Sequence, residues 1–345
     1  MDRIVASFRR QGEACAALGS PLWARLCAVA ADDAEDGGAV ARAVEAWSGG
    51  DPMEQALPLR VLGTAHRLAL LGRAPDLADH LPSCGGEPGG GLEGAFLATV
   101  AGHLPEFRRD TMRPVQTNEV GRSAVLRAGL GVIAEEMGLP IRLFEIGTAA
   151  GLNLRLDRFG YRLGGLEVSG GPPVLTPAWT GPPPPAAPVD VVDRAGCDLH
   201  PIDVTTAEGA ARAESFVWPD MTWRFERMAA AVECARSVPA ELVAARAIDW
   251  LDERLHAEPG TVTVLMHSVM WQYMPPEEQV AIEHLMAARG HDTTAEAPIA
   301  HLRFEPVLES DRRWRFELRL ATWPGGEGRV LARAHPHAEW VRWLD

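Results

Sequence analysis

One short stretch, residues 141–154, constrains the fold of this chain more than any other. After Pro140, the run IRLFEI carries four apolar side chains within six residues, which suits a strand buried in a parallel sheet. A loop of small residues follows from Gly147 to Gly151, and Asn153 lies at the start of the next segment. Strand, glycine turn and helix start form a layout that lets backbone approach a nucleotide-like ligand, and the same layout is also a common structural device. The stretch predicts an α/β fold.

The spacing of these glycines separates several classes of enzyme. Gly147 and Gly151 form G-x-x-x-G, whereas dinucleotide-binding folds carry G-x-G-x-x-G, so an NAD-dependent oxidoreductase is disfavoured. The chain contains no G-x-S-x-G nucleophile elbow, which disfavours a serine hydrolase. An acid, Glu145, stands two residues before the first glycine, so the motif to be explained is acid-x-glycine at a strand end.

Composition limits the cellular compartment and the classes of binding partner that can be expected. A net charge of -14 argues against nucleic acid, because Lys and Arg contacts to phosphate supply most of that affinity. The five cysteines are odd in number and show no C-x-x-C spacing, which fits a reducing cytoplasm better than a disulfide framework or a zinc ribbon. We find neither an apolar run of transmembrane length nor the apolar stretch of a secretory signal. These features predict a cytoplasmic protein with no membrane partner.

The pattern of apolar residues predicts two domains. Residues 1–138 show helical spacing throughout and predict an N-terminal helical domain, with Ser20 and Pro21 as one clear helix start. Residues 139–345 predict a Rossmann-like α/β domain. A Pro- and Gly-rich segment near residues 164–188 is expected to be an insertion or an extended surface connection.

A polar cluster interrupts the helical pattern just before the α/β part. Its five members within seven positions are Gln116, Thr117, Asn118, Glu119 and Arg122. Thr117 or Asn118 could cap the following helix, but capping explains one of these residues and not all five. The cluster therefore predicts either a polar wall facing a pocket or a solvated helix start.

An acid also ends the second expected strand. Val189, Val191 and Val192 read as strand, and Asp198 lies at its end. A carboxylate suits the vicinal diol of a ribose because it accepts two hydrogen bonds and donates none. The alternative is that Asp198 is a turn residue or a helix cap.

Two more strands carry polar residues beyond them. Leu242 to Ile248 gives a possible third strand, followed by Asp249 and by Trp250, which could either stack on a ligand or belong to the core. Thr261 to Met266 is strongly β-prone and ends at His267. This histidine is a candidate base, since an imidazole titrates near neutrality, or else a satisfied buried histidine.

The remainder predicts the end of an α/β sheet. Pro275 to Arg289 reads as a helix and Thr293 to Phe304 as a fifth strand. Arg313 to Thr322 and Arg329 to Ala334 form an expected terminal hairpin. His335 and His337 follow, but a lone His-x-His is too sparse for a metal site, so no metal is predicted.

Taken together, these motifs carry two resemblances. Acid-x-Gly at the first strand, the string GCDLHP at the second, VLMHSVMWQYM at the fourth and the terminal hairpin are similar to the motifs of class I S-adenosylmethionine (SAM) methyltransferases. Ala149 departs from that pattern, because many methyltransferases have glycine there. The strings RPVQTNEVGRSA, FEIGTAAGLNL, VLMHSVMWQYMP and the ending TWPGGEGRVLARAHPHAEWVRWL resemble the bacterial family DUF2332 over nearly the full chain.

The resemblance implies a class I SAM-methyltransferase-like Rossmann sheet and a set of roles. The leading hypothesis is a SAM-dependent methyltransferase acting on a small molecule, and the alternative is a non-catalytic ligand-binding or sensor protein. In this hypothesis three carboxylates converge on one cavity. The cofactor would be bound by Glu145, Gly147, Gly151 and Asn153 at its methionine part, by Asp198 at the ribose and by Asp249 at the adenine. The catalytic pair would be His267 and Tyr273, and the acceptor would be bound by Gln116, Asn118, Glu119, Arg122 and Trp271.

Overall fold

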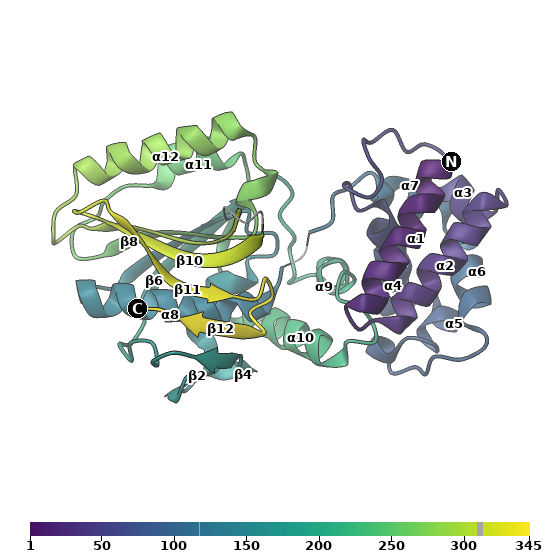
Figure 1. The fold of residues 1–345 in the computed structure, drawn as a ribbon, viewed down its shortest axis with the longest axis horizontal. Helices are drawn as coiled ribbons and strands as arrows, with labels where there is room; N and C mark the ends of the chain where they lie inside the picture. Colours follow the sequence, from purple (N-terminus) through teal and green to yellow (C-terminus); the bar gives the residue numbers. More distant parts are fainter. Residues whose placement is uncertain (117, 309–312) are drawn as a thin grey trace. The chain divides into compact units, whose positions relative to one another are not determined.

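The structure is a computed structural model that describes residues 1–116, 118–308 and 313–345 (Figure 1). The chain forms two compact units, Met1–Thr117 with Asp203–Ala229, and Asn118–Ile202 with Ala230–Asp345. This division differs from the boundary expected near residue 138 in two places. Residues 118–138 join the second unit, and residues 203–229 return to the first.

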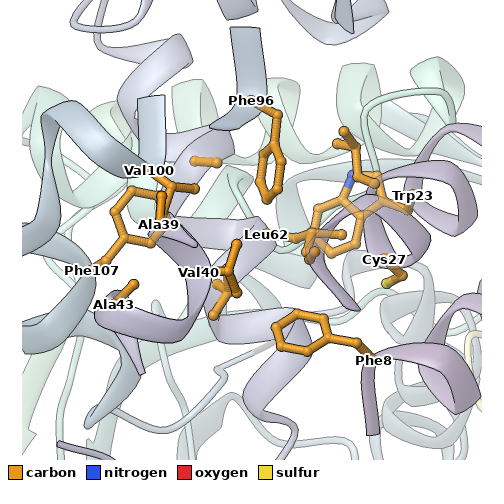
Figure 2. Packing of buried hydrophobic residues seen from close by; sticks show 14 of the residues in the cluster. Phe8, Trp23, Cys27, Ala39, Val40, Ala43, Leu62, Phe96, Val100 and Phe107 are labelled. Carbon is orange, nitrogen blue, oxygen red and sulfur yellow. The ribbon is translucent and has the colours of Figure 1, made fainter. Parts of the chain in front are cut away.

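The first unit is helical. Its helices are α1 (Asp2–Ala17), α2 (Pro21–Glu35), α3 (Ala39–Ala43), α4 (Leu57–Leu70), α5 (Pro75–Ala78), the 3-10 helix η1 (Pro82–Cys84), α6 (Leu92–Gly102), α7 (Leu104–Thr111) and α9 (Ala207–Glu214), and the division between the units falls within α10 (Thr222–Ser237). Figure 2 shows its core, where Phe8, Trp23, Leu62 and Phe96 pack together from α1, α2, α4 and α6. Burial of such aromatic and aliphatic side chains is the main favourable term in folding this unit.

Polar contacts explain why residues 203–229 belong to the helical unit. The Asp220 carboxylate accepts hydrogen bonds from Ser20 Oγ at 2.5 Å and from the Leu22 amide at 3.0 Å, at the start of α2. Arg67 of α4, almost fully buried, forms an ion pair with Glu208 of α9. These contacts join positions more than a hundred residues apart in the sequence, which is why local patterns could not predict them.

The second unit is built on a nine-stranded sheet with the order β5-β12-β11-β10-β9-β8-β1-β6-β7. The strands are β1 (Ile141–Ile146), β5 (Ala178–Thr180), β6 (Val191–Asp198), β7 (Glu241–Ala244), β8 (Val262–Ser268), β9 (Ile299–Leu308), β10 (Trp314–Trp323), β11 (Gly328–Ala334) and β12 (Trp340–Trp343). Strands β7, β6, β1, β8 and β9 run parallel to one another, and β9 to β12 pair antiparallel. The prediction of an α/β fold is therefore confirmed as a mixed α/β unit with a large, mostly parallel sheet.

Helices cover both faces of this sheet (Figure 1). On one face lies α8 (Ser123–Met137), where Gly129 allows close approach, since a Cβ there would come within 2.6 Å of Leu302 in β9. On the other face lie α11 (Ala247–Arg254) and α12 (Pro276–His291), and Ile282 of α12 packs in one core cluster with Phe144 of β1. A three-stranded sheet, β3-β2-β4, occupies part of the Pro- and Gly-rich connection, with β2 at Phe159–Leu163, β3 at Leu166–Val168 and β4 at Gly171–Leu175.

Two segments differ from the expected structure. The segment after the glycine loop is the 3-10 helix η3 (Leu152–Arg158), because the Gly151 carbonyl accepts from the Leu154 amide and from the Arg155 guanidinium rather than from the Arg155 amide. Strand β7 ends at Ala244, and Ile248 already belongs to α11. Across the described ranges, no helix has both the length and the apolar character needed to span a bilayer.

Candidate ligand site at the carboxyl edge of the sheet

The carboxyl ends of the parallel strands define the candidate site. After β1, the chain adds β6 and β7 on one side and then returns to add β8 and β9 on the other side of β1. The order of strands therefore reverses between β1 and β8. In open α/β sheets, ligands bind outside the carboxyl ends of the strands at such a reversal. The segments that leave the sheet there are the loop at residues 147–151 and the turn at residues 268–271.

The loop after β1 is tightly folded. Gly147, Ala149 and Gly151 all have φ between 49° and 65°, a region that costs a non-glycine residue of the order of 1 kcal/mol. A Cβ on Gly147 would lie 2.9 Å from Met270, and one on Gly151 would lie 2.7 Å from Leu242. Both glycines are therefore favoured by the backbone conformation of the loop, and Gly147 also by the close approach of Met270 Cβ.

Glu145 ends β1 beneath this loop. It is 2% exposed, and Thr148 donates its hydroxyl hydrogen to Glu145 Oε2 at 2.8 Å. Burial raises the pKa of Glu145 to about 8, and the neighbouring charge of Asp198 adds to that rise. This environment disfavours the charged form of the side chain, which supports the loop through its contact with the Thr148 hydroxyl.

Asp198 lies against the same loop from the end of β6. Its Oδ2 accepts the amide hydrogen of Ala149 at 2.9 Å, and its Oδ1 accepts that of His200 at 2.8 Å. The residue is partly buried, and the Ala149 carbonyl next to it accepts from the Ile202 amide at 3.0 Å. Asp198 thus acts as a turn residue, and at the same time it brings an ionisable carboxylate to the mouth of the β1 loop.

Residues in and near the predicted polar cluster form hydrogen bonds around the loop. Asn118 Oδ1 accepts the Leu152 amide hydrogen at 2.9 Å, and Ser123 Oγ donates to Asn153 Oδ1 at 2.8 Å. Asn118 and Asn153 are both buried. Glu119, also buried, accepts from the Gly121 amide at 2.9 Å. These side chains fix the backbone around the loop rather than forming an open wall.

The remaining members of that cluster lie in different parts of the structure. Gln116 belongs to the helical unit, where Arg212 donates to it at 3.1 Å. Thr117 lies outside the described residues. Arg122 donates to the Pro336 carbonyl at 2.9 Å and to the Ser268 carbonyl at 3.3 Å, and so connects the end of β8 with the segment after β11.

Two predicted site residues lie away from this group. Asp249 is exposed in the first turn of α11, five residues beyond the end of β7, so it does not join Glu145 and Asp198. The tertiary structure places it there because the chain turns into a helix after Ala244. Trp250 is a core residue whose ring meets Phe144 edge-on at 5.7 Å. Tyr273 is 79% exposed on the 3-10 helix η4 (Trp271–Tyr273).

His267, the predicted base, points into the protein. It is fully buried, with Nδ1 2.7 Å from Glu305 Oε1 and Nε2 2.9 Å from His301 Nε2. One of these two Nε2 atoms carries a hydrogen and donates it, and the other accepts it. Trp271 stacks on the His267 ring at 4.8 Å, which closes its remaining face. His267 is therefore a satisfied buried histidine that positions Glu305.

Sequence reasoning missed both partners of His267. His301 and Glu305 stand four residues apart on β9 and so share one face of that strand. Burial lowers the pKa of His301 well below its ordinary value, and the neighbouring His267 lowers it further. The alternation of polar His301, Arg303 and Glu305 with apolar residues along β9 was the available signal.

Glu305 itself carries an unsatisfied atom. Its Oε1 also accepts the Met270 amide hydrogen at 3.2 Å, while its buried Oε2 has no hydrogen-bond partner among the described residues. Val269, between Ser268 and Met270, has φ 53°, which is a strained conformation for a β-branched residue. An orphaned carboxylate oxygen beside strained backbone at a strand end is a feature of functional sites.

Comparison with known proteins places the whole chain in one family. Neither the curated proteins nor the solved structures yield a match. Residues 5–343 match the model of the family described as "Uncharacterized protein conserved in bacteria (DUF2332)". Because this match spans both compact units, the chain belongs to the DUF2332 family.

Proposed function

We propose that this protein is a SAM-dependent methyltransferase acting on a small molecule. One relationship carries the proposal: the parallel order β7-β6-β1-β8-β9 reverses at β1, and Asp198 from the neighbouring strand bonds to the β1 loop at that reversal. This is the position where an α/β sheet binds nucleotide-like ligands. The net charge of -14 favours a small acceptor over nucleic acid.

The residues present fit SAM in part. A carboxylate suits a ribose diol because it only accepts hydrogen bonds, and Asp198 brings one to the β1 loop, where it also accepts two backbone amides. Glu145 fits the role of an ammonium partner less well, because burial raises its pKa to about 8. Asp249 does not fit the adenine role, because it lies exposed on α11.

The protein itself would then hold the methyl donor and the acceptor in place and remove a proton from the acceptor. When bound, SAM supplies an electrophilic methyl group. The rigid loop and the end of β8 would hold donor and acceptor in line, which is the main source of acceleration in such a transfer. The Glu305 carboxylate would take the proton from the acceptor, with His267 and His301 holding it in place. This assigns to Glu305 the role that the sequence suggested for His267.

Calorimetric titration with SAM tests the proposal. Wild-type protein should bind one equivalent, and Asp198→Asn should weaken binding at least about tenfold, because the amide can accept at only one of its two positions. Asp190→Asn changes an exposed aspartate just before β6 and should leave the affinity unaltered. Absence of any binding at millimolar SAM would remove both the cofactor and the reaction.

A second candidate function, ligand binding without catalysis, is favoured by one observation. Both ring nitrogens of His267 are occupied within the protein, and Tyr273 is exposed, so neither predicted catalytic residue faces the β1 loop as a free base. SAM binding without formation of S-adenosylhomocysteine across a broad panel of metabolites would support this function. Product formation that is lost in Glu305→Gln would support the methyltransferase.

A further inference from the structure

We infer that His335, His337 and Glu339 form a binding site for a divalent first-row transition-metal ion. The inference does not depend on SAM or on methyl transfer. The sequence offered only His335 and His337, which is too few ligands for a site. The structure adds Glu339 and brings one possible ligand atom from each of the three residues within 4.8 Å of the others.

One pair of these ligand atoms lies near the spacing of a loaded site. His335 Nδ1 and Glu339 Oε2 are 3.9 Å apart, and the rings of His335 and His337 are perpendicular, with centroids 5.4 Å apart. His335 Nδ1 also accepts the His337 amide hydrogen at 3.3 Å, a long bond that an ion would replace. With metal bonds of about 2.0–2.2 Å, two ligands of a tetrahedral ion lie about 3.4 Å apart. The histidine and the carboxylate therefore need to approach by about half an ångström, which rotation of the exposed Glu339 side chain can provide.

The backbone that carries these ligands is held firmly. The turn between β11 and β12 is closed by the His335 amide, which donates to the Trp340 carbonyl at 3.0 Å, and by the Ala338 amide, which donates to the His335 carbonyl at 2.7 Å. Ala338 has φ 54°, a strained conformation that the turn imposes. Ligands on a fixed turn lose little conformational freedom on binding, which favours affinity.

A buried arginine joins this turn to the central sheet. The Arg122 guanidinium donates both to the Pro336 carbonyl, between the two histidines, and to the Ser268 carbonyl at the end of β8. Strand β11 runs in the same direction as β8 and β9, so the turn also lies at the carboxyl edge of the sheet. An ion bound there would belong to the same edge as the β1 loop and Glu305.

The ligand set selects the class of ion. Imidazole nitrogens suit Zn²⁺, Fe²⁺, Co²⁺ and Ni²⁺, whereas Mg²⁺ and Ca²⁺ prefer oxygen ligands only. Two histidines and one carboxylate leave at least one coordination position open, as in catalytic rather than structural zinc sites. The alternative is a turn without an ion, in which His335 pairs electrostatically with Glu339 and accepts the His337 amide hydrogen.

Direct metal binding by tag-free, chelator-treated protein tests the site. We expect one equivalent of Zn²⁺ in calorimetry, and visible d–d absorption when Co²⁺ replaces it. Loss of a ligand should cost more than the 10–100-fold of an outer-shell partner, so His337→Ala and Glu339→Gln should each weaken binding by more than about 100-fold. His291→Ala, at the exposed end of α12, is the control and should bind as the wild type does.

Three outcomes would overturn the inference. They are no saturable binding of Zn²⁺ or Co²⁺, binding that Mg²⁺ matches, and binding that both variants retain. Because Glu339 is exposed, Glu339→Gln should fold normally, and its far-ultraviolet circular dichroism verifies this. Lost binding in a folded Glu339→Gln protein therefore reports the ligand and not the fold.

Discussion

His267 Nδ1 lies 2.7 Å from Glu305 Oε1 across neighbouring strands, so the histidine that the sequence presents as a base is turned into the protein. Glu305, and not His267, is therefore the candidate base at this end of the sheet. Glu305 keeps one buried oxygen without a partner, next to the strained turn that follows β8. A carboxylate held in this way is suited to accept a proton or to bind a cation.

The Glu305 contacts predict a measurable stability effect. Glu305→Ala removes the acceptor for His267 Nδ1 and for the Met270 amide, and His267 is too deeply buried to bond to water instead. We expect the free energy of unfolding to fall by about 1–3 kcal/mol in urea denaturation. Glu283→Ala removes an exposed carboxylate and a surface ion pair with Arg303, and should change it by less than about 0.5 kcal/mol. Equal effects of the two variants would contradict this account.

The β1 loop predicts a glycine requirement with two separable causes. Gly147→Ala introduces a residue at φ 65° and a Cβ 2.9 Å from Met270. Gly260→Ala, at φ 81° with nothing within 4 Å of the new Cβ, introduces only the backbone cost. Thermal unfolding should show a loss of about 1 kcal/mol for Gly260→Ala and clearly more for Gly147→Ala. The prediction fails if Gly147→Ala is the milder of the two.

The buried Glu145 predicts a dependence of stability on pH. Burial raises its pKa to about 8 in the folded protein from an ordinary value of 4.5, so between these values the folded state holds a proton that the unfolded state releases. Stability should therefore fall as the pH rises through this window, by at most about 1.4 kcal/mol per pH unit. Hydrogen exchange of the β1 amides at several pH values measures it. Glu145→Gln should flatten the profile, and an unchanged slope in that variant would assign the dependence to another group.

The helical unit should respond to pH in the opposite direction. Burial lowers the pKa of His66 to about 4 from 6.5, and its nitrogens lie 3.0 Å from the Ser215 carbonyl and 2.8 Å from Ser83 Oγ. Between pH 6.5 and 4 the unfolded state takes up a proton that the folded state excludes, so stability should fall as the pH falls. Hydrogen exchange of the α4 amides should show this slope in the wild type and in His80→Gln. His66→Gln should lose it, and retention of the slope would refute the assignment.

Several features of the site could be predicted because they are local. The apolar run at 141–146, the glycine loop after it and the β-prone run ending at His267 became β1, its loop and β8. Asp198 was expected at the end of a strand and lies there. Each depends on hydrophobic period and turn chemistry, which act over a few neighbouring residues.

The partners of these residues could not be predicted in the same way. Glu305 reaches His267 from 38 positions away in the sequence, and Arg122 reaches Pro336 from 214 positions away. Asp249 was expected beside Asp198 because an acid follows the third strand, but the turn into α11 carries it to the surface. A shift of a few residues at a strand end decides whether a side chain faces a site or the solvent.

By itself, the amino-acid sequence determined where β1, β6 and β8 run, but not where β7 ends or that η3 is a 3-10 helix. Periodic burial and turn residues are properties of short stretches. Only the tertiary structure decided that His267 faces inward to Glu305, that burial raises the pKa of Glu145, and that Glu339 lies close to His335 and His337. The reason is physical: burial and hydrogen-bond partners set protonation and orientation, and both are created by contacts between segments that are distant in the sequence.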